Sequence, residues 1–300
     1  MRCELKTAWT CADDGQVIDR TWTDKEEDMV RSLWTGATGM LAQQTSLDNI
    51  ANNLANVNTT GFKSQSIEFK NLLYQTIQTK TTSANGDTKP GNAQVGLGTR
   101  VSSLNTSFPQ GAFFASESDT AFAIGGEGFF GIKGGDGKTY YTRNGNFGWT
   151  LASNGGNMLA TTDGNPVLDT KGNPIILDQK YTTSRITVTK DGEICYPDEN
   201  NNPKSLGVTI GLWQFNNPNG LSREGDTLFE ETAASGRAVN EEGNRNLTKS
   251  TINQGYLEGS NVQVADEMVN MITTQRAYEL NSRVITTSDS MLDTANNLRR

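Results

Sequence analysis

The chain has 300 residues, with 34 acidic and 26 basic side chains and a formal net charge of −8. This acidic balance argues against nucleic acid and against insertion into an anionic membrane, and no apolar run of about 18 residues or more predicts a membrane span. The sequence has no histidine, so the commonest general base and metal ligand is missing. Cys3, Cys11 and Cys195 show neither metal-binding spacing nor a disulfide framework. We therefore expect no enzyme activity, cofactor or metal.

Residues 1–28 differ in pattern from the rest of the chain. They show no sustained hydrophobic period and hold two of the three cysteines. Lys25–Asp28 can be encoded by purine-rich codons that resemble a ribosome-binding sequence just before Met29. We interpret residues 1–28 as a non-native extension produced by a start codon assigned too early; a native, irregular arm is the alternative.

Residues 29–60 predict the first long helix. Apolar and small residues recur at alternating steps of four and three, which is the spacing of one helical stripe. Gly36 and Gly39 each lower the intrinsic helicity by about 1 kcal/mol relative to alanine, so packing must hold this helix. The stripe predicts an assembly seam at Leu33, Ala37, Met40, Leu47 and Leu54.

Residues 61–110 predict an extended connecting region. An Asn-rich run ends the helix, and Gly61 supplies the turn. The segment 63–78 could form a short strand or helix, 79–92 is a polar loop, and 94–107 has the β-branched, partly alternating pattern of a strand.

Residues 111–253 predict an antiparallel β domain. Turn pairs recur about eight to ten residues apart, a spacing typical of hairpins: Asp136-Gly137, Asn144-Gly145, Asn154-Gly155, Asp163-Gly164 and Lys171-Gly172. The expected strands are 139–142, 174–177, 186–189, 194–196 and 207–215. We expect 216–253 to be polar and irregular.

Three apparent chemical motifs in this domain have simpler explanations. Gly126–Gly131 fits a dinucleotide-binding pattern, but that pattern needs a following helix; here a strand and a turn come next, so Phe129 and Phe130 are expected in the core. Gly137-Lys138-Thr139 resembles the end of a phosphate-binding loop without its first glycine. The pairs Glu230-Glu231 and Glu241-Glu242 are expected to be solvated charge rather than a catalytic acid and base.

Residues 254–300 predict the second long helix, with its regular part at 262–298 and a length of roughly 55 Å. Its seam is expected at Met268, Met271, Tyr278, Ile285 and Leu292. Two terminal helices with matching stripes favour chain ends that pair in a coiled-coil-like manner. The predicted fold class is α+β: paired terminal helices, an extended linker and a central β domain.

The residues at both ends resemble a known family. MVRSLWTGATGMLAQQTSLDNIANNLANVNTTGFKSQ resembles the N-terminal signature of bacterial flagellar rod and hook proteins, and GYLEGSNVQVADEMVNMITTQRAYELNSRVITTSDSMLDTANNLRR resembles their C-terminal signature. The central segments AQVGLGTRV, AIGGEGFFGI, YTRNGNF and LFEETAASG favour the distal-rod branch.

That resemblance implies a structural subunit of the distal rod, which stacks helically with copies of itself into a hollow shaft that transmits torque to the hook. The implied partners are neighbouring proximal-rod and hook subunits, the outer bushing rings and the flagellar export apparatus. The implied location is the periplasm-spanning basal body, reached without a cleaved signal peptide.

The sequence leaves three other interpretations open. A proximal-rod or hook subunit would share the end signatures. A secreted β-rich binding module with a helical stalk would not need both chain ends to match, and an enzyme is disfavoured by the missing histidine.

Overall fold

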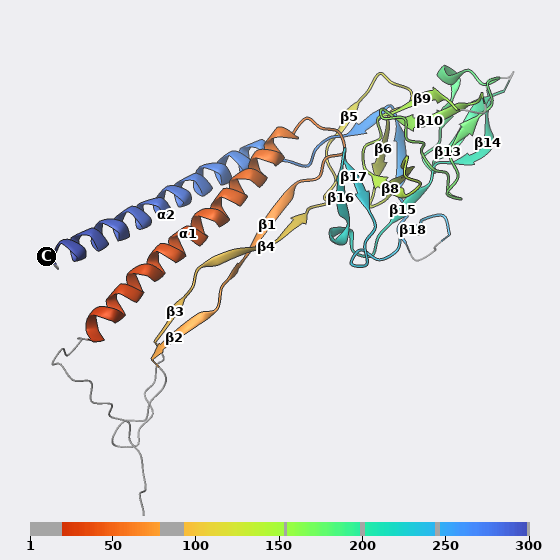
Figure 1. The fold of residues 1–300 in the computed structure, drawn as a ribbon. Coiled ribbons are helices and arrows are strands. Elements are labelled where there is room, and N and C mark those ends of the chain that lie inside the picture. Colours follow the sequence, from red (N-terminus) through yellow and green to blue (C-terminus); the bar gives the residue numbers. More distant parts are fainter. Residues whose placement is uncertain (1–19, 79–92, 153–154, 199–201, 244–246, 299–300) are drawn as a thin grey trace, which may run out of the picture. The chain divides into compact units, whose positions relative to one another are not determined.

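The structure is a computed structural model that describes residues 20–78, 93–152, 155–198, 202–243 and 247–298. It confirms the α+β class, with an N-terminal helix, central antiparallel sheets and a C-terminal helix (Figure 1). The chain divides into two compact units. The helical unit comprises Met1–Ala42, Asn71–Arg100 and Ala277–Arg300, and the β unit comprises Gln43–Lys70 and Val101–Arg276. Neither helix in the described part of the chain has the combination of length and apolarity needed to cross a membrane.

Helix α1 spans Arg20–Ala55. It begins upstream of Met29, while residues 1–19 lie outside the described residues, so the assignment of Met29 as the start remains a prediction. The helix ends in the Asn-rich run, where the Asn56 side-chain amide donates to the Asn52 carbonyl at 2.8 Å. Gly61 then turns the chain with φ of 70°, a left-handed conformation that glycine adopts readily.

Helix α2 spans Val264–Leu298, with Asp266 and Glu267 in its first turn, where negative charge complements the helix dipole. The segment before it is extended rather than helical. Strand β20 (Tyr256–Glu258) pairs with strand β5 (Phe113–Ala115). The helix therefore begins ten residues beyond the boundary expected at 254, because this pairing takes the first part of the C-terminal segment into the β unit.

The other strands are short. They are β1 (Gln65–Asn71), β2 (Tyr74–Gln78), β3 (Ala93–Gly96), β4 (Thr99–Thr106), β6 (Phe122–Gly125), β7 (Phe129–Lys133), β8 (Thr139–Thr142), β9 (Phe147–Leu151), β10 (Asn157–Thr161), β11 (Ile176–Leu177), β12 (Thr187–Val188), β13 (Glu193–Pro197), β14 (Pro203–Thr209), β15 (Leu212–Gln214), β16 (Ser222–Gly225), β17 (Leu228–Glu230), β18 (Val239–Asn240) and β19 (Thr251–Gln254). The largest sheet has the order β16-β17-β8-β7-β15-β18, and β19 pairs separately with β6.

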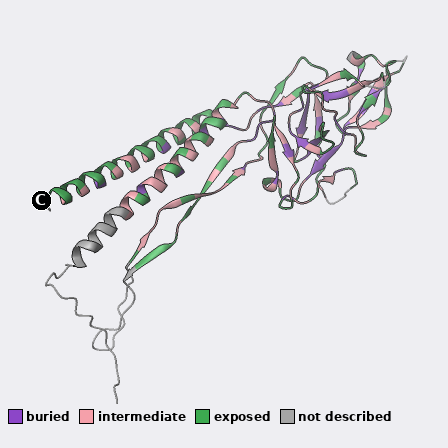
Figure 2. Ribbon diagram, viewed as in Figure 1, coloured by how far each residue is buried: buried purple, intermediate pink, exposed green. Residues whose placement is uncertain are grey.

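Strand β7 separates two apolar clusters of the β unit. Successive side chains of a strand point to opposite faces. Phe130 accordingly packs with Phe122, Ile132 and Ile252, whereas Phe129 packs with Tyr141, Trp213 and Phe229. Both phenylalanines are buried and the chain continues as a strand, so the expectation that Gly126–Gly131 serves the core is confirmed. Buried residues gather in these strands (Figure 2).

Most expected strands of the β domain are present, with two differences. The single strand expected at 207–215 is two strands, β14 and β15, which belong to different sheets. The region 216–253, expected to be irregular, contains β16, β17, β18 and the start of β19. β16 and β18 are the edge strands of the largest sheet and β17 lies inside it, beside β16; the short, mixed-polarity sequences of these strands show little alternation of apolar and polar residues. The loop expected at 79–92 lies outside the described residues.

Candidate functional site

Three charged side chains from distant parts of the chain meet inside the β unit. Lys63 follows α1, Arg143 follows β8 and Glu258 ends β20; all three are almost completely buried. The Lys63 ammonium lies 2.6 Å from Glu258 Oε1, and Arg143 Nη1 lies 3.3 Å from Glu258 Oε2. We call this set the charged junction. It ties the N-terminal segment, the β domain and the C-terminal segment together at one carboxylate.

Backbone groups form further hydrogen bonds with the charged junction, whereas Arg143 Nε is buried without a hydrogen-bond partner. Lys63 Nζ also donates to the Pro109 carbonyl at 2.7 Å, and Arg143 Nη2 donates to the Gly126 carbonyl at 2.7 Å. Glu258 Oε1 accepts from the Gly111 N–H at 2.9 Å. Buried charges are tolerated when they are paired and hydrogen-bonded in this way, so the junction is a structural device.

Burial sets the electrostatics of the charged junction. Desolvation lowers the pKa of Lys63, and the attraction and hydrogen bond of Glu258 act in the opposite direction. The same loss of water lowers the pKa of Arg143, again opposed by Glu258. Nearby in sequence, burial raises the pKa of Tyr141 to about 12.

The chain around Lys63 is held from two further sides. The Gly61 N–H donates to the Glu258 carbonyl at 2.8 Å, and a methyl group on Gly61 would come within 2.5 Å of the Asn144 nitrogen. Arg223 donates to the Lys63 carbonyl and lies over the rings of Phe62 and Phe229, 5.0 and 5.6 Å from their centroids. Only glycine fits at position 61.

Within the β unit, Asn53 links the C-terminal end of α1 to the N-terminal end of α2. Its side chain exchanges hydrogen bonds with the Gln65 backbone, accepting from the N–H at 3.0 Å and donating to the carbonyl at 2.9 Å. The same amide donates to Glu267 Oε1 on α2 at 2.9 Å. Asn53 therefore joins α1, β1 and the first turn of α2.

In the helical unit, α1 and α2 contact each other through small residues. The Ser32 and Ser288 hydroxyl oxygens are 2.9 Å apart. A methyl group on Gly36 would lie 3.0 Å from Ile285 Cγ1, and one on Gly39 would lie 2.8 Å from Asn281 Nδ2. Residue numbers rise along α1 as they fall along α2, so the two helices run antiparallel here.

The predicted seam residues lie beside this contact line rather than on it, with the exception of Ile285. The line on α1 runs through Ser32, Gly36 and Gly39, each one position before a predicted residue, because small side chains let the backbones approach closely. Leu33, Ala37, Met40, Leu47, Leu54, Met271, Ile285 and Leu292 are half-buried, whereas Met268 and Tyr278 are exposed. These values belong to a single chain, so a continuous coiled-coil seam and the role of these ten residues in assembly remain predictions.

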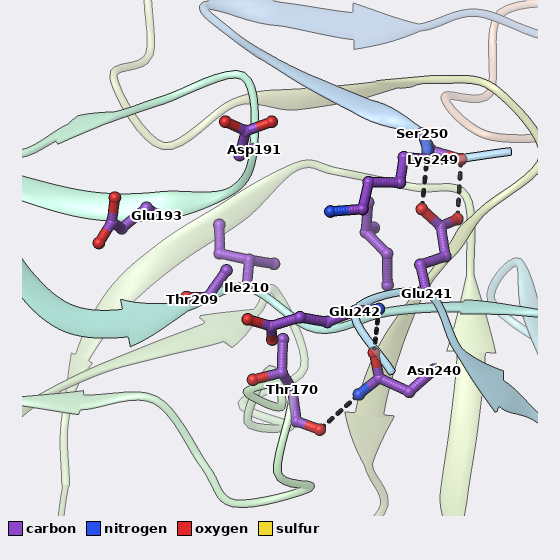
Figure 3. Close-up of a pocket in the computed structure, with 11 residues that line it drawn as sticks. Thr170, Asp191, Glu193, Thr209, Ile210, Asn240, Glu241, Glu242, Lys249 and Ser250 are labelled. Atoms are coloured by element: carbon purple, nitrogen blue, oxygen red, sulfur yellow. Dashed lines mark hydrogen bonds between the residues drawn. The ribbon is translucent and has the colours of Figure 1, made fainter. Parts of the chain in front are cut away.

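Glu241 corrects one expectation. The sequence predicts a solvent-exposed carboxylate at Glu241, but the side chain is buried. Its carboxylate accepts hydrogen bonds from the Ser250 N–H at 2.7 Å, the Ser250 hydroxyl at 2.8 Å and the Gln214 amide at 2.9 Å. It lines a cavity of about 280 Å³, shown in Figure 3. Asp191 and Glu193 line the same cavity from another segment. The described residues contain no group of three acidic or cysteine side chains placed to hold a metal ion.

Comparison with models of known protein families finds three matches, and each matched segment contains one residue of the charged junction. The model "Flagella basal body rod protein" matches residues 33–63, which end at Lys63. "Flagellar hook protein FlgE/F/G D1 domain" matches 123–196, which include Arg143. "Flagellar basal body rod FlgEFG protein C-terminal" matches 253–298, which include Glu258.

Whole-chain relatives agree with the family models. The flagellar basal-body rod protein FlgG of Borreliella burgdorferi is 44% identical over 275 residues, covering 91% of this chain and the whole relative. FlgG of Caulobacter vibrioides is 40% identical, covering 90% and 100%. FlgG of Bacillus subtilis is 38% identical, covering 91% and 100%.

The fold, the structural role of its buried charges and these relatives define a structural protein of the bacterial flagellum, not an enzyme. The resemblance seen in the sequence is thereby confirmed. The chain belongs to the flagellar basal-body rod protein family. Within that family it is a structural subunit of the distal rod, located in the basal body.

Proposed function

We propose that this chain assembles with copies of itself into a helical, hollow shaft that transmits torque from the motor to the hook. The observation that carries the proposal is the charged junction. It fixes the residues that follow α1 and precede α2 to the β domain through buried ion pairs 2.6 and 3.3 Å long, so a load applied to the terminal helices reaches the β domain through short, desolvated contacts.

The antiparallel contact of α1 and α2 supports an inner-tube role for both helices. Gly36 and Gly39 bring the helices close, and the rest of α2 keeps many apolar side chains exposed, including Met268, Val269 and Ile272. Apolar surface of this extent is characteristic of assembly interfaces. In this proposal the neighbouring proximal-rod and hook subunits, and the outer bushing rings, contact the assembled shaft.

The proposal extends to how the subunit reaches its place. The shaft spans the periplasm, and the chain arrives through the flagellar export apparatus without a cleaved signal peptide. Leu, Ile, Val and Phe together make up about a fifth of the chain, which is close to the composition at which cores become marginal, and such a chain is readily kept unfolded for export.

Complementation tests this function directly. The chain is expressed in a bacterial strain that lacks its own distal-rod subunit, and basal bodies are isolated and viewed by negative-stain electron microscopy. We expect restored rods, hooks and swimming. Basal bodies that still stop at the proximal rod, despite secretion of the chain, would contradict the proposal.

A further inference from the structure

A second cavity of the β unit is lined by the end of α1, the segment that follows it, and the hairpin of β16 and β17. Its volume is about 360 Å³, and its lining includes Phe62, Arg223, Asp226 and Phe229. All of its lining residues belong to the β unit. A volume of this size falls in the range of small-molecule sites, about 300–1,000 Å³. We call it the arginine cavity.

Arg223 is the cation of the arginine cavity that lacks an anion. The other cation in the lining, Lys63, is paired with Glu258, whereas Arg223 forms no ion pair within the described residues. Burial lowers the pKa of Arg223, with no carboxylate to offset it. Its charge is therefore partly removed from water without compensation, which is unfavourable for a folded chain.

The hydrogen-bond donors of Arg223 are also largely unused. A guanidinium carries five N–H donors in a planar fork. Within the described residues Arg223 makes one hydrogen bond, from Nη2 to the Lys63 carbonyl, and its Nε is buried without a partner. Asn52 lines the cavity as well. Its side-chain oxygen accepts from Asn56 at 3.1 Å, while no described residue accepts from its amide nitrogen. The cavity thus combines positive charge with unused donors, and an anion would satisfy both.

The turn between β16 and β17 gives an independent indication of a ligand site. Asp226 and Thr227 have φ of 46° and 61°, in the left-handed region that is unfavourable for a β-branched residue such as threonine. Both residues line the arginine cavity. Backbone strain of this kind gathers at ligand sites, and here it falls at the same place as the unpaired cation.

We propose that the arginine cavity binds a small carboxylate anion through the Arg223 guanidinium. The planar fork of arginine matches a carboxylate in two parallel hydrogen bonds. A doubly charged phosphate is disfavoured, because Asp226 lines the same cavity and the chain carries a net charge of −8. Phe62, Leu228 and Phe229 supply an apolar wall for a short hydrocarbon tail. The carboxylate belongs either to a free organic acid or to an acidic side chain of a neighbouring protein.

Propionate is the probe for this site, added to the full chain at constant ionic strength with sodium chloride as the balancing salt. The first readout is the proton–nitrogen NMR signal of the Arg223 Nε–H group, identified by its loss in Arg223→Gln. We expect this signal to shift in a saturable manner. Calorimetric titration is expected to show an affinity at least about tenfold lower in Arg223→Gln, because hydrogen bonds to charged groups are strong.

Arg237→Gln is the matched control, since it removes the same charge from an exposed position outside the cavity; it should bind propionate as wild type does. A shift that does not saturate, or equal affinities of Arg223→Gln and wild type, would overturn the proposal.

Two milder variants cover the case in which Arg223→Gln loses its fold by circular dichroism. Asn52→Asp adds a negative charge to the cavity and removes a donor, so we expect it to bind propionate more weakly than wild type. Asp226→Asn removes a negative charge and should bind propionate more tightly. Unchanged affinity in both variants would count decisively against the carboxylate site.

A capped peptide, N-acetyl-glycyl-aspartyl-glycinamide, and its asparaginyl counterpart identify the source of the carboxylate. Binding of the aspartyl peptide alone, with the affinity of propionate, assigns the site to an acidic side chain of another protein. Binding of propionate without the peptide assigns it to a free organic acid, and failure of both probes would refute the inference. The site goes beyond the proposed function: rods restored by a chain that binds no carboxylate would leave the shaft and remove the site, and the reverse result would leave the site alone.

Discussion

Glu258→Gln tests whether the charged junction holds the β unit together. In the native chain the Glu258 carboxylate lies 2.6 Å from the Lys63 ammonium and 3.3 Å from the Arg143 guanidinium. The substitution keeps the shape of the side chain but leaves these two buried cations without a carboxylate. Removing one partner of a buried ion pair costs about 3–5 kcal/mol, a large part of a typical folding free energy of about 5–15 kcal/mol. For a unit of roughly 200 residues, each kcal/mol lowers the unfolding temperature by about 2–4 °C, so we expect a decrease of about 6–20 °C.

The assay is thermal unfolding of the full chain, followed by near-ultraviolet circular dichroism, with Glu230→Gln as the matched control. Glu230 pairs with Lys138 at the same 2.6 Å, but those side chains are 26% and 59% exposed, so its loss is worth about 0–1 kcal/mol. Adding Lys63→Met to Glu258→Gln is expected to recover part of the loss, because one stranded cation is removed. If Glu258→Gln unfolds within about 2 or 3 °C of Glu230→Gln, where costs that differ by at least about 2 kcal/mol predict a difference of about 4 °C or more, the reasoning is wrong.

Three other positions give further predictions. In urea unfolding, Gly61→Ala should lower the free energy of unfolding far more than Gly164→Ala. Both glycines have positive φ, but only at Gly61 would the added methyl group lie against backbone, at 2.5 Å. Equal losses of stability in the two variants would show that this backbone contact does not matter. Burial raises the pKa of Tyr141 to about 12, so the stability that its neutral phenol contributes to the folded state is complete below about pH 10 and is lost as the pH rises through about 12. The urea midpoint of Tyr141→Phe should therefore decline less at alkaline pH than that of wild type, and an identical decline would contradict this assignment. Leu292→Asp should abolish rods and swimming because a buried, unpaired charge prevents helix docking, whereas Asn297→Lys should be tolerated; normal swimming of the Leu292→Asp strain would refute the predicted seam.

The terminal helices and the hairpin character of the middle could be predicted because they depend on local signals. Heptad spacing marked α1 and α2, and turn glycines such as Gly137, Gly155 and Gly164 do adopt positive φ. On α1 the contact line with α2 runs through Ser32, Gly36 and Gly39, because close approach favours small side chains. Hydrophobicity instead marks the neighbouring Leu33 and Met40, whose role in assembly stays a prediction.

The charged junction could not be found from the sequence pattern. Lys63 and Glu258 are 195 positions apart, and no local rule distinguishes a buried, paired lysine from an exposed one. Glu241 was misjudged for the same reason, since its three hydrogen-bond donors come from Ser250 and Gln214. The available signal was indirect: Lys63, Arg143 and Glu258 each fall within a segment that resembles the rod and hook family.

The pairing of β19 with β6 has a consequence for synthesis. Ile252, which is 1% exposed, packs into the larger core opposite Ile124, and Glu258 comes six residues later. A ribosome must therefore translate most of the chain before the β unit can close, and contacts of such long sequence separation also form slowly. Many domains fold while their C-terminal residues are still being made, but this one lacks a core strand and its central carboxylate until near the end of translation. The nascent chain consequently remains incompletely folded for most of its synthesis, which is the state in which a polypeptide can be threaded through a narrow conduit.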